Sequence, residues 1–336
     1  MEMRYARWER SPRVVAIGGG HGLSTLLRGL KYHTRNLTGI VTVFDDGGGS
    51  GMLRNDLNML PPGDIRNCME ALANTEPVME QLLAYRFPEG SLKGQAFGNL
   101  LLAALNGISG SFDEAVAKMS QVLAITGRIL PVTNGNVALR AVLENGSEVV
   151  GESKIPEFQM GQGCRIREVS LNPQAPVALP EAVEAIRNAR LILLGPGSLY
   201  TSVIPNLLVE GIPEAIRESS ALKIYVGNIM TQGGETEGMT LSDHVAALLK
   251  HGGGTGLVDL CLANVAPVPC EILERYWEEG AEPILVDREK VEALGVEVVE
   301  RPMISAETIY ARHAPRTLAD TIMEIFNERA ETKIIS

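Results

Sequence analysis

Short runs of aliphatic and β-branched residues alternate along this chain with segments in which apolar residues recur every three or four positions. Two of the runs, residues 14–17 and 40–44, each end in a glycine-rich stretch, and the first then continues into a helical pattern. A continuous apolar run is typical of a strand buried on both faces, and the order strand, turn, helix, strand is typical of a βαβ unit. The pattern therefore predicts an α/β fold: a Rossmann-like three-layer sandwich with a mainly parallel sheet.

The same alternation continues toward the C-terminus. Apolar stripes predict helices over residues 23–30, 65–72 and 112–123, the last with Ser111 or Asp113 as its cap. After Pro180 the pattern predicts a helix over 180–189, strands over 190–194, 222–226, 258–262, 284–286 and 296–299, and a closing helix over 318–329.

Residues 133–176 have a different character. Two alternating runs, 137–143 and 148–152, flank an Asn145-Gly146 pair, which is typical of a β-hairpin turn, and a third run covers 165–171. We expect residues 133–176 to form an inserted antiparallel β-hairpin subdomain. The whole would be a single domain over 13–330, with short tails at 1–12 and 331–336.

Composition narrows the function. The chain has 336 residues, 45% of them hydrophobic, and a net charge of -11, which argues against non-specific binding to nucleic acid or an anionic membrane. The four cysteines form no CxxC pair, the first residues lack the apolar stretch of a secretory signal, and no apolar run approaches the ~20 residues of a membrane span. We expect a cytoplasmic protein, and a homodimer, with no nucleic-acid partner.

The first glycine turn, residues 18–25, is the best candidate for a phosphate site. A glycine-rich turn that opens a helix offers bare backbone N–H groups and the positive end of the helix dipole, and both favour anions. It has neither the lysine of a P-loop nor the third glycine of a GxGxxG motif. The candidate residues are Gly19, Gly20, His21, Gly22 and Ser24. The alternative is a tight turn without a ligand, in which His21 is structural.

The second glycine turn follows residues 40–44 and begins with two acids. Asp45 or Asp46 could accept a hydrogen bond from a ribose hydroxyl, and the pair could hold Mg²⁺, with Gly47 beside them. The alternative is a pair of aspartates that bond to their own turn.

Later segments supply further candidates. Loops that follow strands in the second half contain Gly195, Gly197 and Ser198, and then Asn228, Thr231 and Gln232. Ligands of open α/β sheets bind at such strand ends. Asp64 and Asn99 each lie near a helix start, where they could cap the helix or face a ligand. Arg312 could bind a diphosphate, whereas spacing alone makes Tyr276 a core residue.

Six motifs in fixed order carry a family resemblance: GGGHGLSTLL, FDDGGGSG, PPGDIRN, FGNLLLAAL, GPGSLYTSVIPNLL and NIMTQGGET. Over about residues 13–329 the chain resembles the YvcK branch of the CofD-like superfamily, whose members are labelled gluconeogenesis factors. The resemblance implies a protein that binds UDP-N-acetylglucosamine and supports cell shape and cell-wall precursor supply during gluconeogenic growth. It also implies that Tyr276 and Arg312 contact the nucleotide sugar.

The other branch of that superfamily, the 2-phospho-L-lactate transferases, supplies the main alternative, a nucleotide-dependent transferase with Mg²⁺ on Asp45 and Asp46. The GGGSG after Asp46 favours the regulatory branch. No nucleophile–base pair stands out, which suits binding without turnover. An NAD oxidoreductase is the weakest reading, because such an enzyme does not usually carry a second glycine turn there.

Overall fold

The structure, a computed structural model, describes residues 11–305 and 310–335. The expected tail over residues 1–12 therefore lies outside the described residues, apart from Ser11 and Pro12. Among the described helices, none is long and apolar enough to cross a membrane.

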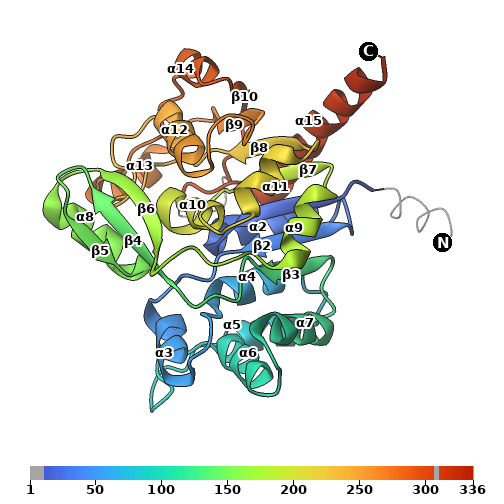
Figure 1. Cartoon of the computed structure of the whole chain (residues 1–336), viewed down its shortest axis with the longest axis vertical. Coiled ribbons are helices and arrows are strands. Elements are labelled where there is room, and N and C mark those ends of the chain that lie inside the picture. The colour runs from blue at the N-terminus through green and yellow to red at the C-terminus, as the bar shows by residue number, and fades with distance from the viewer. Residues whose placement is uncertain (1–10, 306–309, 336) are drawn as a thin grey trace.

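Seven parallel strands form the central sheet, in the order β10-β9-β8-β7-β1-β2-β3 (Figure 1). The strands at its centre are buried along their whole length because helices cover both faces. The strands are β1 (Val14–Gly18), β2 (Leu37–Val41), β3 (Arg128–Pro131), β7 (Leu191–Leu194), β8 (Leu222–Val226), β9 (Leu260–Asn264) and β10 (Glu297–Arg301).

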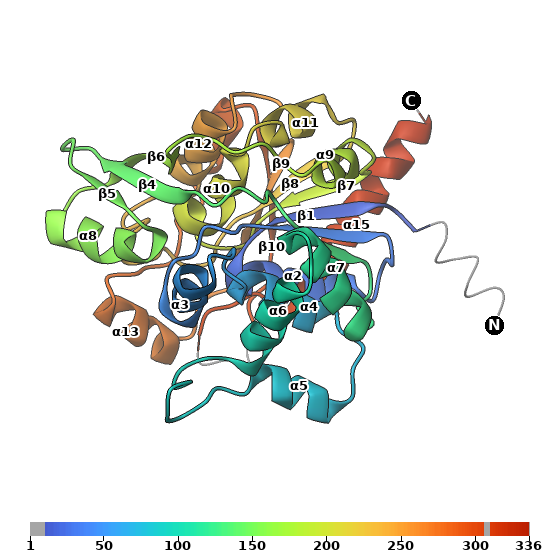
Figure 2. The ribbon, with the colours of Figure 1, turned by 60° about the horizontal axis from the view of Figure 1, so that its bottom comes forward.

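Helices lie on both sides of this sheet. Figure 2 shows α2 and α4 on one side and α9, α11 and α12 on the other, and α2 packs against both α4 and α15. These helices are α2 (Gly20–Leu30), α4 (Gly63–Leu72), α9 (Pro180–Arg187), α11 (Ile212–Glu218), α12 (Leu241–His251) and α15 (Pro315–Ile335). The others are α3 (Gly48–Leu57), α5 (Pro77–Ala84), α6 (Phe97–Gly107), α7 (Phe112–Val122), α10 (Ile204–Leu207), α13 (Cys270–Glu278) and α14 (Arg288–Ala293). The three-layer prediction is confirmed.

The inserted segment forms its own three-stranded antiparallel sheet, in the order β5-β4-β6. Its strands are β4 (Ala138–Leu143), β5 (Glu148–Val150) and β6 (Ile166–Asn172). Gly146 has φ +84° in the predicted hairpin turn. The short 3₁₀ helix η1 (Glu152–Lys154) and α8 (Ile155–Gln162), which the pattern did not predict, connect β5 to β6.

Several predicted boundaries were wrong. The run over residues 40–44 is a strand only as far as Val41; Thr42 N–H still donates to the carbonyl of Gly18 (2.9 Å), and the chain then leaves the sheet. Residues 284–286 form no strand: only a single bridge joins Met230 to Pro283, and proline has no N–H to continue a ladder. The closing helix α15 is longer than predicted and reaches Ile335.

The topology brings the first glycine turn against the turn that follows β7. The neighbours β1 and β7 end at the same edge of the sheet, with Ile17 paired to Leu194. A Cβ built on Gly22 would lie 2.3 Å from the carbonyl oxygen of Pro196, so only a glycine permits this approach. The turn also needs Gly20, whose φ is +59°.

We predict that Gly22→Ala lowers the free energy of unfolding by about 1–3 kcal/mol, because the new methyl group must push α2 away from Pro196. Urea unfolding followed by circular dichroism measures the change. Gly161→Ala in α8 is the matched control, because its Cβ would meet open space. Equal stability changes in the two variants would contradict the packing argument.

Candidate functional site

A cleft of about 540 Å³ opens at the carboxyl edge of the sheet, where the turns after β1, β7 and β8 meet. Open α/β sheets bind their ligands at this edge. The sequence candidates that line the cleft are Gly19, Gly20, His21, Gly22, Asp45, Gly197, Ser198, Asn228, Thr231, Gln232, Tyr276 and Arg312. Segments from both halves of the chain therefore form one site.

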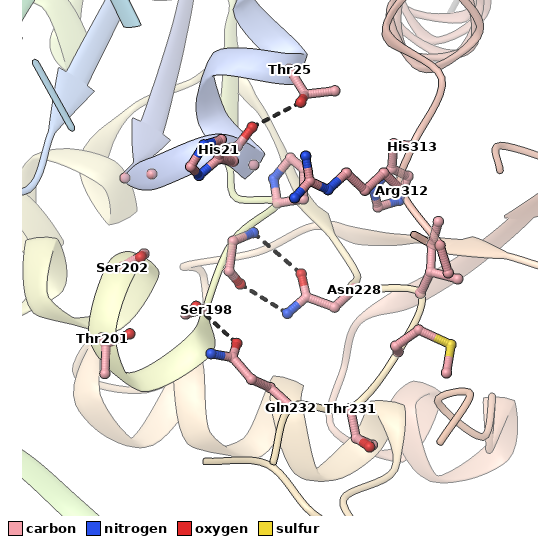
Figure 3. A pocket seen from close by; sticks show the side chains of 18 of the residues that line it. His21, Thr25, Ser198, Thr201, Ser202, Asn228, Thr231, Gln232, Arg312 and His313 are labelled. Atoms are coloured by element: carbon pink, nitrogen blue, oxygen red, sulfur yellow. Dashed lines mark hydrogen bonds between the residues drawn. The ribbon is translucent and has the colours of Figure 1, made fainter. Parts of the chain in front are cut away.

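The first glycine turn forms the start of α2 on one wall of the cleft. The first N–H groups of a helix have no acceptor within the helix, so they are available to a ligand. Asp64 accepts one of them, from Gly20. Thr25 lines the cleft one turn further along, and its hydroxyl donates to the carbonyl of His21 (2.8 Å; Figure 3).

The turn after β7 is tied to the loop after β8 by side-chain amides. Asn228 Nδ2 donates to the carbonyl of Gly197 (2.8 Å), and the N–H of Gly197 donates back to Asn228 Oδ1 (3.2 Å; Figure 3). The Ser198 hydroxyl donates to Gln232 Oε1 (2.8 Å). These bonds fix a second wall of the cleft that carries hydroxyl and amide groups.

Tyr276 and Arg312 lie at the mouth of the cleft. Residues 303–305 pair with 312–314, since the N–H of Ser305 donates to the carbonyl of Arg312 (2.7 Å). The guanidinium of Arg312 stacks over the ring of Tyr310, 5.1 Å from its centroid, and is exposed. Tyr276 is half-buried, packs against the small apolar cluster that contains Ile229, and hydrogen-bonds through its hydroxyl to the backbone of Ala311. Tyr276 therefore packs against apolar residues, as its helical spacing predicts, and also lines the cleft, where the family resemblance expects a ligand contact.

Basic side chains gather on one side of the cleft. Burial and the nearby Arg312 lower the pKa of His21. Burial lowers the pKa of His313 to about 4, so this ring is neutral at pH 7, and its Nε2 is buried without a hydrogen-bond partner. Figure 3 shows His21, Arg312 and His313 near one another.

Three carboxyl groups also gather in the cleft. Burial, and then repulsion from Asp45, raises the pKa of Asp64 to about 6. Burial, and then the charges of Asp45 and other acids, raises the pKa of Glu152 to about 8, and burial also raises the pKa of Asp45. The cleft thus combines Arg312 and two histidines with a group of acids, of which Glu152 keeps its proton at neutral pH.

Some candidates lie outside the cleft. The Ser24 hydroxyl donates to the carbonyl of His21 (3.0 Å), inside the helix turn. Asn99 is buried and accepts a hydrogen bond from Arg66 Nε (3.0 Å), and α6 is capped at Ala96, so Asn99 neither caps the helix nor lines the cleft. The N–H of Gly195 continues the sheet pairing to Ile17 (2.9 Å).

The acid pair also separates. Asp45 lines the cleft and accepts the N–H of Gly47 (2.8 Å), whereas Asp46 turns toward the insert and accepts the N–H of Ser153 (2.9 Å). Neighbouring residues in a turn point in different directions, so Asp45 and Asp46 do not form the expected metal pair. Among the described residues, no group of three or more His, Cys, Asp or Glu side chains is arranged to hold a metal.

Sequence reasoning missed several lining residues. Glu152 and Pro156 come from the insert, which no local signal connects to the cleft. Asp64 was left open between cap and ligand contact; α4 is capped at Pro62, and Asp64 lies in its first turn with its carboxyl group at the Gly20 amide. Ala311 and His313 were also missed, whereas Thr25, Pro196, Thr201, Ser202, Ile229 and Met230 lie within the turns and loops that the sequence indicated.

Fold and site together define an open α/β protein with a polar cleft at the carboxyl edge of a parallel sheet. Residues 14–304 match the family described as 2-phospho-L-lactate transferase CofD, and the chain belongs to that family.

Relatives agree along nearly the whole chain. It is 45% identical to the "Gluconeogenesis factor" of Bacillus subtilis, over 95% of this chain and 99% of that protein. It is 42% identical to the protein of the same name from Listeria innocua, over 97% of this chain and 99% of that protein. A crystal structure of a Bacillus halodurans protein superimposes with a TM-score of 0.90 at 45% identity, covering 94% of this chain and all of that one. The family resemblance is confirmed.

We predict that Glu152→Gln raises the free energy of unfolding above that of wild type, and that this gain is larger at pH 8 than at pH 5. The folded chain holds a proton on Glu152 up to about pH 8, which the unfolded chain loses above its ordinary value of 4.5. Stability therefore falls as pH rises between those values, and the glutamine variant removes this contribution.

Thermal unfolding at pH 5 and pH 8 measures this effect, with exposed Glu157→Gln as the control. The Glu152→Gln variant should gain at least ~1 kcal/mol at pH 8 relative to wild type. The same gain in Glu157→Gln would contradict the role assigned to burial.

Proposed function

We propose that this chain binds a nucleotide sugar, UDP-N-acetylglucosamine, in the cleft and acts as a cytoplasmic regulatory protein without turnover. The observation that carries the proposal is the polar lining of the cleft: the start of α2 with His21, and the exposed Arg312, supply hydrogen-bond donors, and Asp45, Asp64 and Glu152 supply carboxyl groups. A nucleoside diphosphate sugar needs both kinds of partner, since it has two phosphates at its centre and hydroxyl groups at its end.

The start of α2 and Arg312 suit the diphosphate. The N–H groups of the first turn of α2, the imidazole of His21 and the guanidinium of Arg312 supply the donors that phosphate oxygens need. Because Arg312 is exposed in this structure, its donors are accessible to a ligand that enters the mouth of the cleft.

The carboxyl groups in the cleft suit a sugar. Carboxyl groups with raised pKa values can both donate and accept hydrogen bonds, and sugar hydroxyls need both. The half-buried ring of Tyr276 offers an apolar face for a base or sugar ring. A phosphate ligand without hydroxyl groups would leave these acids without hydrogen-bond partners.

The names of the relatives support a role in gluconeogenic growth, and the resemblance to the YvcK branch supports a role in cell shape and cell-wall precursor supply. A regulatory function would follow if the bound nucleotide sugar reports the supply of precursors. A homodimer stays a prediction.

We predict that Arg312→Ala weakens binding of UDP-N-acetylglucosamine about 10–100-fold, the loss expected for charge-assisted hydrogen bonds to phosphate. Isothermal titration calorimetry measures the affinity. Arg301→Ala is the control, since Arg301 is an exposed arginine on β10 outside the cleft. No binding by the wild type, with or without Mg²⁺, would overturn the proposed function.

A nucleotide-dependent transferase is the second candidate, because the carboxyl groups of Asp45 and Asp64 both face the phosphate-binding turn and the family model is described as a transferase. Mg²⁺ is commonly held by one or two carboxylates together with ligand phosphates, so Asp45 and Asp64 fit it, in place of Asp45 and Asp46. A bound Mg²⁺ would offset negative charge on phosphate.

For this candidate we predict no product when the wild type is mixed with a guanylylated phospholactate donor, a deazaflavin acceptor and Mg²⁺. Liquid chromatography with mass spectrometry detects the transfer. Product that disappears in Asp64→Asn, but persists in the control Asp56→Asn, would replace the binding function with the transferase.

A further inference from the structure

Glu235 is a buried acid directly behind the cleft. It belongs to the loop after β8, its side chain is 2% exposed, and it does not line the cleft itself. Its Oε1 accepts two backbone hydrogen bonds, from the N–H groups of Tyr200 (2.6 Å) and Thr201 (2.9 Å). One carboxylate oxygen therefore holds two consecutive amides of the opposite turn.

Those two amides belong to the glycine turn after β7, one of the loops in which the sequence indicates ligand-binding residues. They lie in the first turn of the short π-helix η2 (Leu199–Val203). Because Glu235 accepts them, and Asn228 accepts the N–H of Gly197, three amides of this turn are already used within the protein. A carboxylate is the natural competitor of phosphate for such donors.

Ser198, Thr201 and Ser202 of the same turn line the cleft. The Ser198 hydroxyl donates to Gln232, and the Thr201 hydroxyl, like the Thr201 N–H, hydrogen-bonds to Glu235. Glu235 thus takes up the N–H groups of Tyr200 and Thr201 and also orients the Thr201 side chain at the cleft wall. In the first glycine turn Asp64 takes only the N–H of Gly20, and the N–H groups of His21 and Gly22, which line the cleft, have no acceptor within α2.

The second oxygen of Glu235, Oε2, is buried and has no hydrogen-bond partner. Burial raises the pKa of Glu235 to about 7, although hydrogen bonds from the two backbone N–H groups and from the Thr201 hydroxyl oppose this. The titratable groups near enough to act on Glu235, or be acted on by it, are Glu152, Tyr200 and Tyr225. A proton on Oε2 would remove the buried charge and leave Oε1 as the acceptor.

We infer that Glu235 is a positioning residue: it closes the amides of Tyr200 and Thr201 to the ligand, fixes the Thr201 side chain at the cleft wall, and so leaves the diphosphate to the first glycine turn. The inference rests on the proposed function for the identity of the ligand. The arrangement of the turn can be tested without any ligand.

The test compares Glu235→Ala, Glu235→Gln and the matched control Glu237→Gln, which removes an equal charge two residues away and outside the cleft. Hydrogen–deuterium exchange of residues 198–203 is followed by mass spectrometry in the full-length protein at pH 6 and pH 8, without ligand. Affinity for UDP-N-acetylglucosamine is measured by calorimetry, and circular dichroism checks that each variant is folded.

In Glu235→Ala the freed amides should exchange about 10-fold faster or more, and the affinity should fall about 10-fold. Glu235→Gln keeps an acceptor oxygen, so its exchange and affinity should stay within about 3-fold of wild type. An ionised carboxylate accepts hydrogen bonds more strongly than a neutral carboxyl group or an amide. The wild type should therefore protect the amides of Tyr200 and Thr201 from exchange better than Glu235→Gln does, and this difference should increase from pH 6 to pH 8. Glu237→Gln should behave as wild type.

Unchanged exchange in a folded Glu235→Ala, or faster exchange in Glu237→Gln of the same size, would overturn the inference. If Glu235→Ala does not fold, the inference is tested by comparing wild type with Glu235→Gln at the two pH values. A difference in protection that does not increase from pH 6 to pH 8 would then overturn the inference. If the wild type binds no nucleotide sugar, the proposed function fails, while the exchange measurements still test the role of Glu235.

Discussion

The close approach of two backbone turns, Gly22 against Pro196, is the constraint on which the cleft depends. The turns follow β1 and β7, which are hydrogen-bonded neighbours, so they start about 4.8 Å apart, the spacing of strands in a sheet. Any side chain at position 22 would fill the space between them. Because glycine removes that side chain, amides from the first half of the chain and hydroxyl groups from the second half face one cavity. The parallel sheet thus brings the turns together, and glycine lets them touch.

Charge in this cleft follows from burial as much as from residue type. The whole chain carries a net charge of -11, yet the cleft presents the exposed guanidinium of Arg312. Deeper groups lose charge instead: His313 is held neutral, and Glu152 and Asp64 keep protons to higher pH than a solvated acid does. A low-dielectric interior disfavours every isolated charge, whatever its sign. An anionic ligand that binds here is therefore repelled less than the number of acids suggests.

The fold could be predicted from the sequence because it depends on local pattern. Buried strands and amphipathic helices repeat with their own periods, and the glycine turns mark where strands end. The boundary errors are local too: residues 42–44 are as apolar as a strand but leave the sheet, and the isolated bridge at Pro283 does not extend into a ladder over residues 284–286.

The site was harder to predict, because whether a residue belongs to it depends on the direction in which its side chain points. Asp45 and Asp46 are equivalent in sequence, yet one faces the cleft and the other the insert. Ser24 and Thr25 are likewise both hydroxyl residues, and only Thr25 lines the cleft. Such choices depend on the angle at which a turn leaves its strand, which composition and spacing do not encode. Tyr276 shows the complementary case, in which helical spacing identifies an apolar contact correctly but does not reveal the cleft beside it.

The insert is therefore part of the site rather than an appendage to it. Glu152 and Pro156 line the cleft, and the N–H of Ser153 holds the carboxyl group that Asp46 turns away from it. The backbone of Pro156 also limits Gly234, where a Cβ would lie 2.6 Å from the Pro156 carbonyl oxygen, and Glu235 follows immediately. The loop that positions the second turn is thus packed directly against the insert. A shift of the small sheet would move Glu152 and the support of Glu235 together, so the three-stranded insert and the two glycine turns must be regarded as one binding unit.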